Sequence, residues 1–223
     1  MATNKRVLGR IGFYLGLAVF LIITLFPFFV MLMTSFKSAK EAISLHPTIL
    51  PQEWTLQHYI DIFNPLIFPF VDYFRNSMVV SLTSSVIAVF LGTLGAYALS
   101  KLRFKGRTTI NASIYTVYMF SGILLVVPLF KIITALGIYD TELALIITMV
   151  TQTLPTAVFM LRSYFDTIPD EIEEAAMMDG LNRLQIIFRI TVPLAISGLV
   201  SVFVYCFMVA WNDYLFASIF LSS

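Results

Sequence analysis

Carboxylates are concentrated in one stretch of this chain, residues 162–189. The stretch contains the following acids: Asp166, Asp170, Glu171, Glu173, Glu174 and Asp179. Catalysis would need a convergent set of acid, base, nucleophile or metal ligand around such groups. No histidine accompanies them, because His46 and His58 lie in another segment, twelve residues apart. No Walker A, GxSxG or HExxH pattern occurs either. We therefore expect a non-enzyme that binds no metal or cofactor and hydrolyses no ATP itself.

The composition excludes further kinds of site and partner. The single cysteine, Cys206, excludes an intramolecular disulfide and a cysteine-based metal cluster. The formal net charge of +1 offers no basic surface to neutralise nucleic-acid phosphates. The composition therefore argues against a nucleic-acid partner and against a disulfide-stapled or cysteine-metal fold.

The acidic stretch predicts a short helix with marked ends, followed by a second one. Pro169 suits the first helical position, and Asp170 and Glu171 complement the positive end of the helix dipole. Gly180 supplies a left-handed stop, and Asn182 can cap the next helix.

On the first helix one face is small and apolar, because Ile172, Ala175 and Ala176 recur at helical spacing. This predicts either a docking element for a cytoplasmic partner or a helix that lies along the membrane or its own bundle.

The elements that must position this segment are membrane helices. Of the 223 residues 59% are hydrophobic and 12% charged, with a mean hydropathy of +0.89, whereas soluble domains carry about 25% charged residues. Long apolar runs must form helices in lipid, and about 20 residues span it. We predict five spans, at residues 11–33, 77–99, 110–130, 141–161 and 190–211. The first follows basic residues but is too long for a signal peptide, so we expect it to be retained.

Basic residues set the predicted orientation. Ten fall on one side of the five spans: Lys5, Arg6, Arg10, Lys101, Arg103, Lys105, Arg107, Arg162, Arg183 and Arg189. Four fall on the other: Lys37, Lys40, Arg75 and Lys131. The N-terminus and the acidic stretch are therefore expected in the cytoplasm.

The acidic stretch also resembles a known motif. Glu174, Ala175 and Ala176, then Gly180, Ile190 and Pro193, are spaced as in the EAA loop of ABC importer permeases. Val192 stands where that family usually has Leu. The segments Phe26-Pro27, Thr34-Ser35-Phe36-Lys37, Asn76-Ser77 and Ala210-Trp211-Asn212-Asp213-Tyr214 are similar to permeases of carbohydrate importers, of the maltose permease type.

The resemblance implies an all-α, polytopic membrane helix bundle, the type I ABC transmembrane domain. Residues 1–75 would hold the cytoplasmic N-terminus, first span and outer loop, and residues 76–223 the core with the coupling loop 162–189. The family usually has a sixth span, so five spans lead us to expect a C-terminally truncated core.

The resemblance also implies a function and partners. The chain would be one permease subunit of an ATP-driven sugar or oligosaccharide importer in the bacterial inner membrane. It would act with a second permease subunit, two ATP-binding subunits, an extracytoplasmic solute-binding protein and membrane lipid. Its contacts with the ATPase would be Glu174, Ala175, Ala176, Asp179 and Gly180.

The substrate contacts stay open. Candidates are the polar residues in or next to the spans: Asn111, Thr148, Thr151, Gln152, Thr153, Asn212 and Asp213. Each has hydrogen bonding between helices, or a place at the membrane interface, as an alternative role. Two other functions also stay open: import of another small solute, such as a polyol or phosphodiester, and a stand-alone secondary transporter.

Overall fold

The computed structural model describes residues 2–45, 47–119 and 122–221. Every regular element among them is helical, which confirms the all-α prediction. The chain divides into two compact units, Met1–Tyr73 and Phe74–Ser223.

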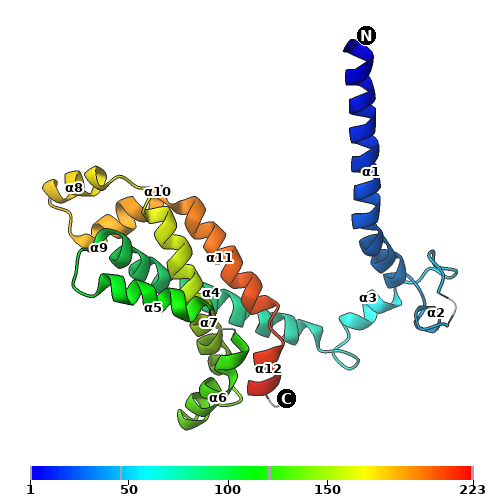
Figure 1. The fold of residues 1–223 in the computed structure, drawn as a ribbon. Helices are drawn as coiled ribbons and strands as arrows, with labels where there is room; N and C mark the ends of the chain where they lie inside the picture. The colour runs from blue at the N-terminus through cyan, green and yellow to red at the C-terminus, as the bar shows by residue number, and fades with distance from the viewer. Residues whose placement is uncertain (1, 46, 120–121, 222–223) are drawn as a thin grey trace. The chain divides into compact units, whose positions relative to one another are not determined.

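The first unit holds one long apolar helix and two short ones. Helix α1 spans Ala2–Ser35, and α2 (Ala39–Ala42) and α3 (Gln57–Ile62) follow it (Figure 1). Within α1, the segment Gly9–Ser35 has a mean hydropathy of 2.7, and its most apolar window packs against no other element of the first unit. A helix of 27 residues is about 40 Å long, which is enough to cross about 30 Å of hydrocarbon.

The loop after α1 is held by polar contacts rather than by a large core. The ammonium of Lys37 is buried and donates to the carbonyl of Thr48. Glu41 accepts bonds from the hydroxyl of Thr48, 2.6 Å away, and from the backbone of Gln52. The Thr48 hydroxyl holds the pKa of Glu41 below its usual value.

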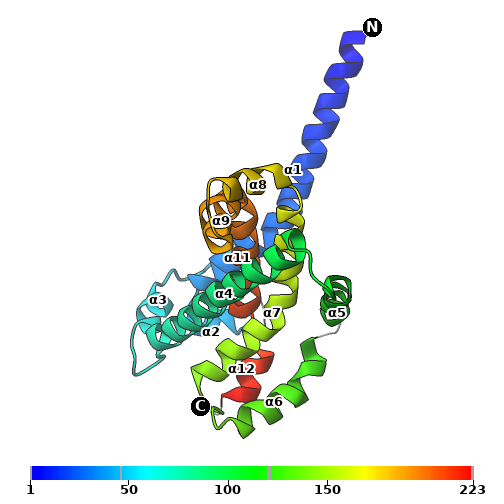
Figure 2. The same ribbon diagram turned by 90° about the vertical axis from the view of Figure 1, so that its left-hand side faces the viewer.

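The second unit is a bundle of longer helices. Its elements are α4 (Phe70–Lys101), which begins in the first unit, α5 (Arg107–Met119), the 3₁₀ turn η1 (Gly122–Leu125), α6 (Val126–Ala135), α7 (Glu142–Phe165), α8 (Asp170–Met178), α9 (Arg183–Ile186), the π-helical turn η2 (Ile187–Thr191), α10 (Val192–Leu194), α11 (Ile196–Trp211) and α12 (Leu215–Phe220). Helices α8 and α9 lie at one end of this unit and α6 and α12 at the other, with α7 running between them (Figures 1 and 2).

Three helices of the described chain are single candidate spans, Gly9–Ser35, Phe70–Lys101 and Glu142–Phe165. These contain the predicted spans 11–33, 77–99 and, with Thr141 as the N-cap, 141–161. Hydropathy therefore placed these helices correctly, although α4 is longer than predicted.

The other two predicted spans are not single straight helices. The predicted span 110–130 is divided between α5 and Gly122–Ala135, which are bent by 100°, and 190–211 runs across an 85° bend between Arg183–Leu194 and Ile196–Trp211. Pro193 stands just before this second bend and has no N–H to donate to the preceding turn. The turn there is π-helical, with the N–H of Val192 donating to Ile187 five residues back.

The second unit has two apolar clusters, one where α4, α7 and α11 meet and one where α6, α7 and α12 meet. Small residues allow close approach in membrane proteins, and two glycines do so here. Gly198 in α11 lies against the ring of Tyr164, and Gly92 in α4 lies against Ala157 in α7. The end of the unit that carries α8 is therefore tied to the membrane helices by close packing.

Candidate functional site

Helix α8 and the turn after it form as the local sequence predicts. The first turn carries the acids Asp170, Glu171 and Glu173. Their negative charges stabilise the helix, because its N-terminus is the positive end of the helix dipole. Gly180 has a φ of +85°, a conformation that costs other residues energy. Asn182 accepts a bond from the backbone of Gln185 in a complete capping box. One detail was wrong: Pro169 is the N-cap rather than the first helical residue.

The predicted apolar face of α8 is not free as a whole. Ala176 is buried, whereas Ala175 is exposed and Ile172 is 39% exposed. The helix is rotated so that Glu173 and Ala176 face inward. Its free side carries Glu171, Glu174, Ala175 and Met178, of which Met178 is 88% exposed.

Lys101, the last residue of α4, fastens the start of α8 to the bundle. Its ammonium donates to Asp170 Oδ1 at 2.7 Å and to the carbonyl of Ile168 at 2.5 Å. The Lys101 side chain is 5% exposed, and that of Asp170 is 69% exposed. The hydrogen bond and the charge of Lys101 hold the pKa of Asp170 below its usual value.

A second contact between α4 and α8 was missed by the sequence analysis. Glu173 is only 3% exposed and accepts a hydrogen bond from the hydroxyl of Tyr97 at 3.0 Å. Thr191 Oγ1 donates to its other oxygen at 3.4 Å, and Arg183 Nη1 is 3.8 Å from Oε2. No sequence signal separated Glu173 from the neighbouring acids.

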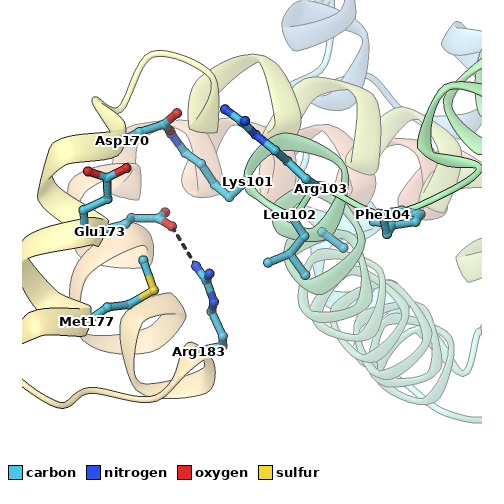
Figure 3. A pocket seen from close by; sticks show the side chains of 10 residues that line it. Lys101, Leu102, Arg103, Phe104, Asp170, Glu173, Met177 and Arg183 are labelled. Carbon is cyan, nitrogen blue, oxygen red and sulfur yellow. Dashed lines mark hydrogen bonds and ion pairs between the residues drawn. The ribbon is translucent and has the colours of Figure 1, made fainter.

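These groups line a cavity of about 760 Å³ between the end of α4, α8 and α9 (Figure 3). Lys101, Arg103 and Arg183 contribute cations, and Asp170, Glu173 and Glu174 contribute carboxylates. Leu102, Phe104 and Met177 form apolar parts of its wall. Such a mixed lining suits charged side chains of a protein partner.

The five predicted coupling residues lie in one continuous segment but differ in access. Glu174, Ala175, Asp179 and Gly180 are exposed. Ala176 is 5% exposed and packs inward. Their role in contacting an ATPase remains a prediction.

Most candidate substrate contacts have local partners. Thr148 and Thr153 are buried and donate to carbonyls of their own helix. Asn111 accepts from Arg162, Asn212 donates to Met208, and Asp213 accepts from the backbone of Ala217. These contacts correspond to the alternative, structural role.

Thr151 and Gln152 differ from the other candidates, because both line a cavity of about 170 Å³. Tyr118 and Tyr205 also line it. The Nε2 atom of Gln152 is buried, and no hydrogen-bond partner for it lies in the described part of the chain.

No group of three or more His, Cys, Asp or Glu residues that could hold a metal occurs in residues 2–45, 47–119 and 122–221. His58 contacts the carbonyl of Lys37 through Nε2 at 2.9 Å. His46 lies outside the described residues. Cys206 is buried in α11.

Comparison with known families gives the site its context. The family model for the inner membrane component of binding-protein-dependent transport systems matches residues 84–223. The chain belongs to this family. The permease therefore crosses the membrane several times and serves transport.

Two relatives and one solved structure show the extent of the similarity. An inner membrane ABC transporter permease protein of Escherichia coli K12, YcjP, is 90% identical over 223 residues, which are all of this chain and 80% of the relative. The trehalose/maltose permease MalG of Thermococcus litoralis is 35% identical over 217 residues, 97% of this chain and 77% of the relative. The crystal structure of a bacterial ABC transporter that imports alginate matches with a TM-score of 0.83 at 27% identity, over 99% of this chain and 76% of that one.

These similarities confirm the prediction of an ABC importer permease with the corresponding helical transmembrane fold.

Proposed function

We propose that the chain is one permease subunit of an ATP-driven importer of sugars or oligosaccharides, and that α8 couples it to a separate ATP-binding subunit. The free side of α8 is the observation that carries the coupling role. Met178 and Ala175 are exposed there beside Glu171 and Glu174. Exposed apolar groups on a short helix, ringed by charges, suit docking into a groove of a partner.

The substrate class rests on the relatives. The permeases of Thermococcus litoralis and Mycobacterium tuberculosis are named for trehalose or maltose, and the one of Agrobacterium fabrum for sulfoquinovosyl glycerol. A sugar or a glycosylated small molecule is therefore the proposed cargo. Import of a polyol is the second candidate, because the relative of Agrobacterium fabrum is named for a compound with a glycerol moiety.

The proposed assembly contains a second permease subunit, two ATP-binding subunits and an extracytoplasmic solute-binding protein. The N-terminus and α8 lie on the cytoplasmic side in this proposal. The positive residues Lys101, Arg103 and Arg107 at the α8 end of the second unit support it. Residues 76–223 act as the transmembrane core and 162–189 as its coupling loop.

The coupling role is tested by Ala175→Arg. Ala175 is exposed, so the larger side chain leaves the packing of α8 intact but occupies the docking face. The chain is tagged, extracted in mild detergent from its host, and the proteins retained with it are identified. Retention of an ATP-binding subunit by the wild type and its loss from Ala175→Arg are expected.

Ala42→Arg is the matched control, because Ala42 is an exposed alanine of another short helix, α2. It is expected to retain the ATP-binding subunit. If the wild type is recovered without such a subunit, the importer function is refuted and a stand-alone transporter takes its place. If Ala175→Arg retains the subunit as the wild type does, the docking face is wrongly assigned.

A further inference from the structure

At the end of the second unit that carries α8 and α9, the carboxylate of Glu173 is buried. Glutamate is seldom buried unless it is paired, because a charge removed from water is costly. Glu173 is 3% exposed and lies on the inward face of α8. The buried carboxylate therefore needs hydrogen-bond donors or cations from the groups around it.

Its partners come from three different elements. Tyr97, 1% exposed, donates to Oε2 from α4. Thr191, 0% exposed, donates to Oε1 from the π-helical turn η2. Arg183 of α9 faces Oε2 from 3.8 Å, as the dashed line in Figure 3 marks.

Two of these partners, Tyr97 and Thr191, belong to or adjoin membrane helices. Tyr97 lies four residues before the end of α4, and Thr191 precedes the bend at which α11 begins. One carboxylate thus joins the coupling helix to both a long span and the head of another.

The geometry points to Glu173 as a positioning residue: it makes α8 move as one body with the end of α4 and with η2. This inference rests on the proposed coupling function and adds the route by which a displacement of α8 reaches the spans. Glu173 acts through Tyr97 and Thr191 and not by touching the ATPase, because its side chain is buried.

The other link between α4 and α8 is poorly suited to this task. The Asp170 partner of Lys101 is 69% exposed, and exposed ion pairs are screened and weak. Hydrogen bonds to a buried charge are stronger and more directional, because little water competes for the partners. A displacement of α8 therefore reaches α4 and η2 mainly through Glu173.

The test is Glu173→Gln in the complete transporter, purified with its native partners and reconstituted in lipid. Glutamine keeps the size of the side chain and can still accept from Tyr97, but it removes the charge that holds both hydroxyls. ATP hydrolysis and retention of the ATP-binding subunit are expected to persist. The amount of solute imported per ATP hydrolysed, with maltose and trehalose as the probes, is expected to fall several-fold.

A second readout needs no known substrate. Spin labels are placed at Ile172, which is 39% exposed on α8 and lies outside the proposed docking face, and at Leu91, which is exposed on α4. The native Cys206 is 1% exposed and does not compete for the label. In the wild type the distance between the labels is expected to be the same without nucleotide and with Mg-ATP and vanadate. In Glu173→Gln the distribution is expected to shift or broaden when nucleotide is added.

Three variants serve as comparisons. Tyr97→Phe and Thr191→Val each remove one donor at nearly constant shape and are expected to lower coupling as Glu173→Gln does. Combined with Glu173→Gln, Tyr97→Phe is expected to add less than it does alone, because the charge that strengthens the Tyr97 hydrogen bond is already gone. Glu142→Gln makes the same chemical change at an exposed site in the first turn of α7 and is expected to behave as the wild type.

The outcomes separate the two proposals. A wild type that retains no ATP-binding subunit refutes the importer function itself. A wild type that retains it, with unchanged coupling and unchanged label distances in Glu173→Gln, overturns only the role of Glu173. If Glu173→Gln does not yield folded protein, Tyr97→Phe and Thr191→Val decide: wild-type coupling in both of them overturns the inference.

Discussion

Replacing Gly198 by alanine tests the close contact between α11 and α7. An alanine Cβ at this position would lie 2.4 Å from Cγ, 2.6 Å from Cδ2 and 2.8 Å from Cδ1 of Tyr164. Ordinary contacts of such atoms begin near 3.4 Å. Because Cγ is the attachment point of the ring, the ring cannot swing clear by moving its tip, and α11 and α7 must separate.

The expected loss follows from two opposing effects. Overpacking of a well-packed core costs about 1–3 kcal/mol, and three overlapping ring atoms place Gly198→Ala at the upper end. Alanine in place of glycine inside a helix returns about 1 kcal/mol. The net destabilisation is about 2 kcal/mol, which corresponds to a fall in Tm of about 4–8 °C for a chain of this size.

The assay is thermal unfolding of the purified permease in detergent, followed by circular dichroism. Gly16→Ala is the control, since nothing lies within 4 Å of a Cβ at that position of α1, and its Tm should equal or slightly exceed the wild-type value. Gly92→Ala should be intermediate, because its Cβ would lie 3.1 Å from that of Ala157. A Tm for Gly198→Ala as high as that of Gly16→Ala would refute the close approach of α11 to α7.

Four further expectations concern the two ends of the bundle. Lys101→Met leaves the carbonyl of Ile168 without its donor and should cost about 1–3 kcal/mol, read as a lower Tm. An unchanged Tm would contradict the role of Lys101 in fastening the start of α8 to α4. Because Lys101 lowers the pKa of Asp170 from 3.8, the stabilisation is present above that value and is lost as the pH falls through the lower, folded value. The Tm difference between wild type and Asp170→Asn should therefore be constant from about pH 5 to 7 and shrink below about pH 4. A difference that grows on acidification would contradict a lowered pKa of Asp170. Asn182→Ala removes the capping box and should cost about 1 kcal/mol, seen as faster amide exchange confined to residues 183–186; unchanged exchange there would contradict the cap. Gln152→Leu should lower maltose or trehalose uptake while the ATP-binding subunit is still retained, whereas unaltered uptake would remove Gln152 from the substrate candidates.

Local chemistry made part of the candidate site predictable from the sequence. Gly180 and Asn182 end one helix and begin the next through backbone conformation and a single side chain, so neighbouring residues suffice to predict them. The spans α1, α4 and α7 followed from hydropathy, because lipid demands long helices irrespective of what packs beside them.

Rotation and bending could not be predicted in the same way. The acids of α8 are alike in type, and what distinguishes Glu173 is its contacts with Tyr97, 76 residues earlier, and with Thr191. The bend after Pro193 escaped hydropathy, because membrane helices tolerate proline and the apolar run continues through it. The rotation depends on tertiary contacts that leave no mark on composition or periodicity, whereas Pro193 marks the position of the bend without fixing its size.

Two contacts of the second unit constrain the acidic segment 162–189: the packing of Gly198 on Tyr164 and the hydrogen bond between Thr191 and Glu173. The chain leaves α7 just after Tyr164, passes through α8 and η2, and returns in α11 at Gly198, which lies against the Tyr164 ring. The segment between them is therefore pinned at both ends to the same point of the bundle. Within it, Glu173 bonds to Thr191, so α8 cannot shift alone without breaking that bond or carrying the head of α11 with it. Under the proposed function, a displacement of α8 by an ATP-binding subunit would therefore carry a membrane helix with it.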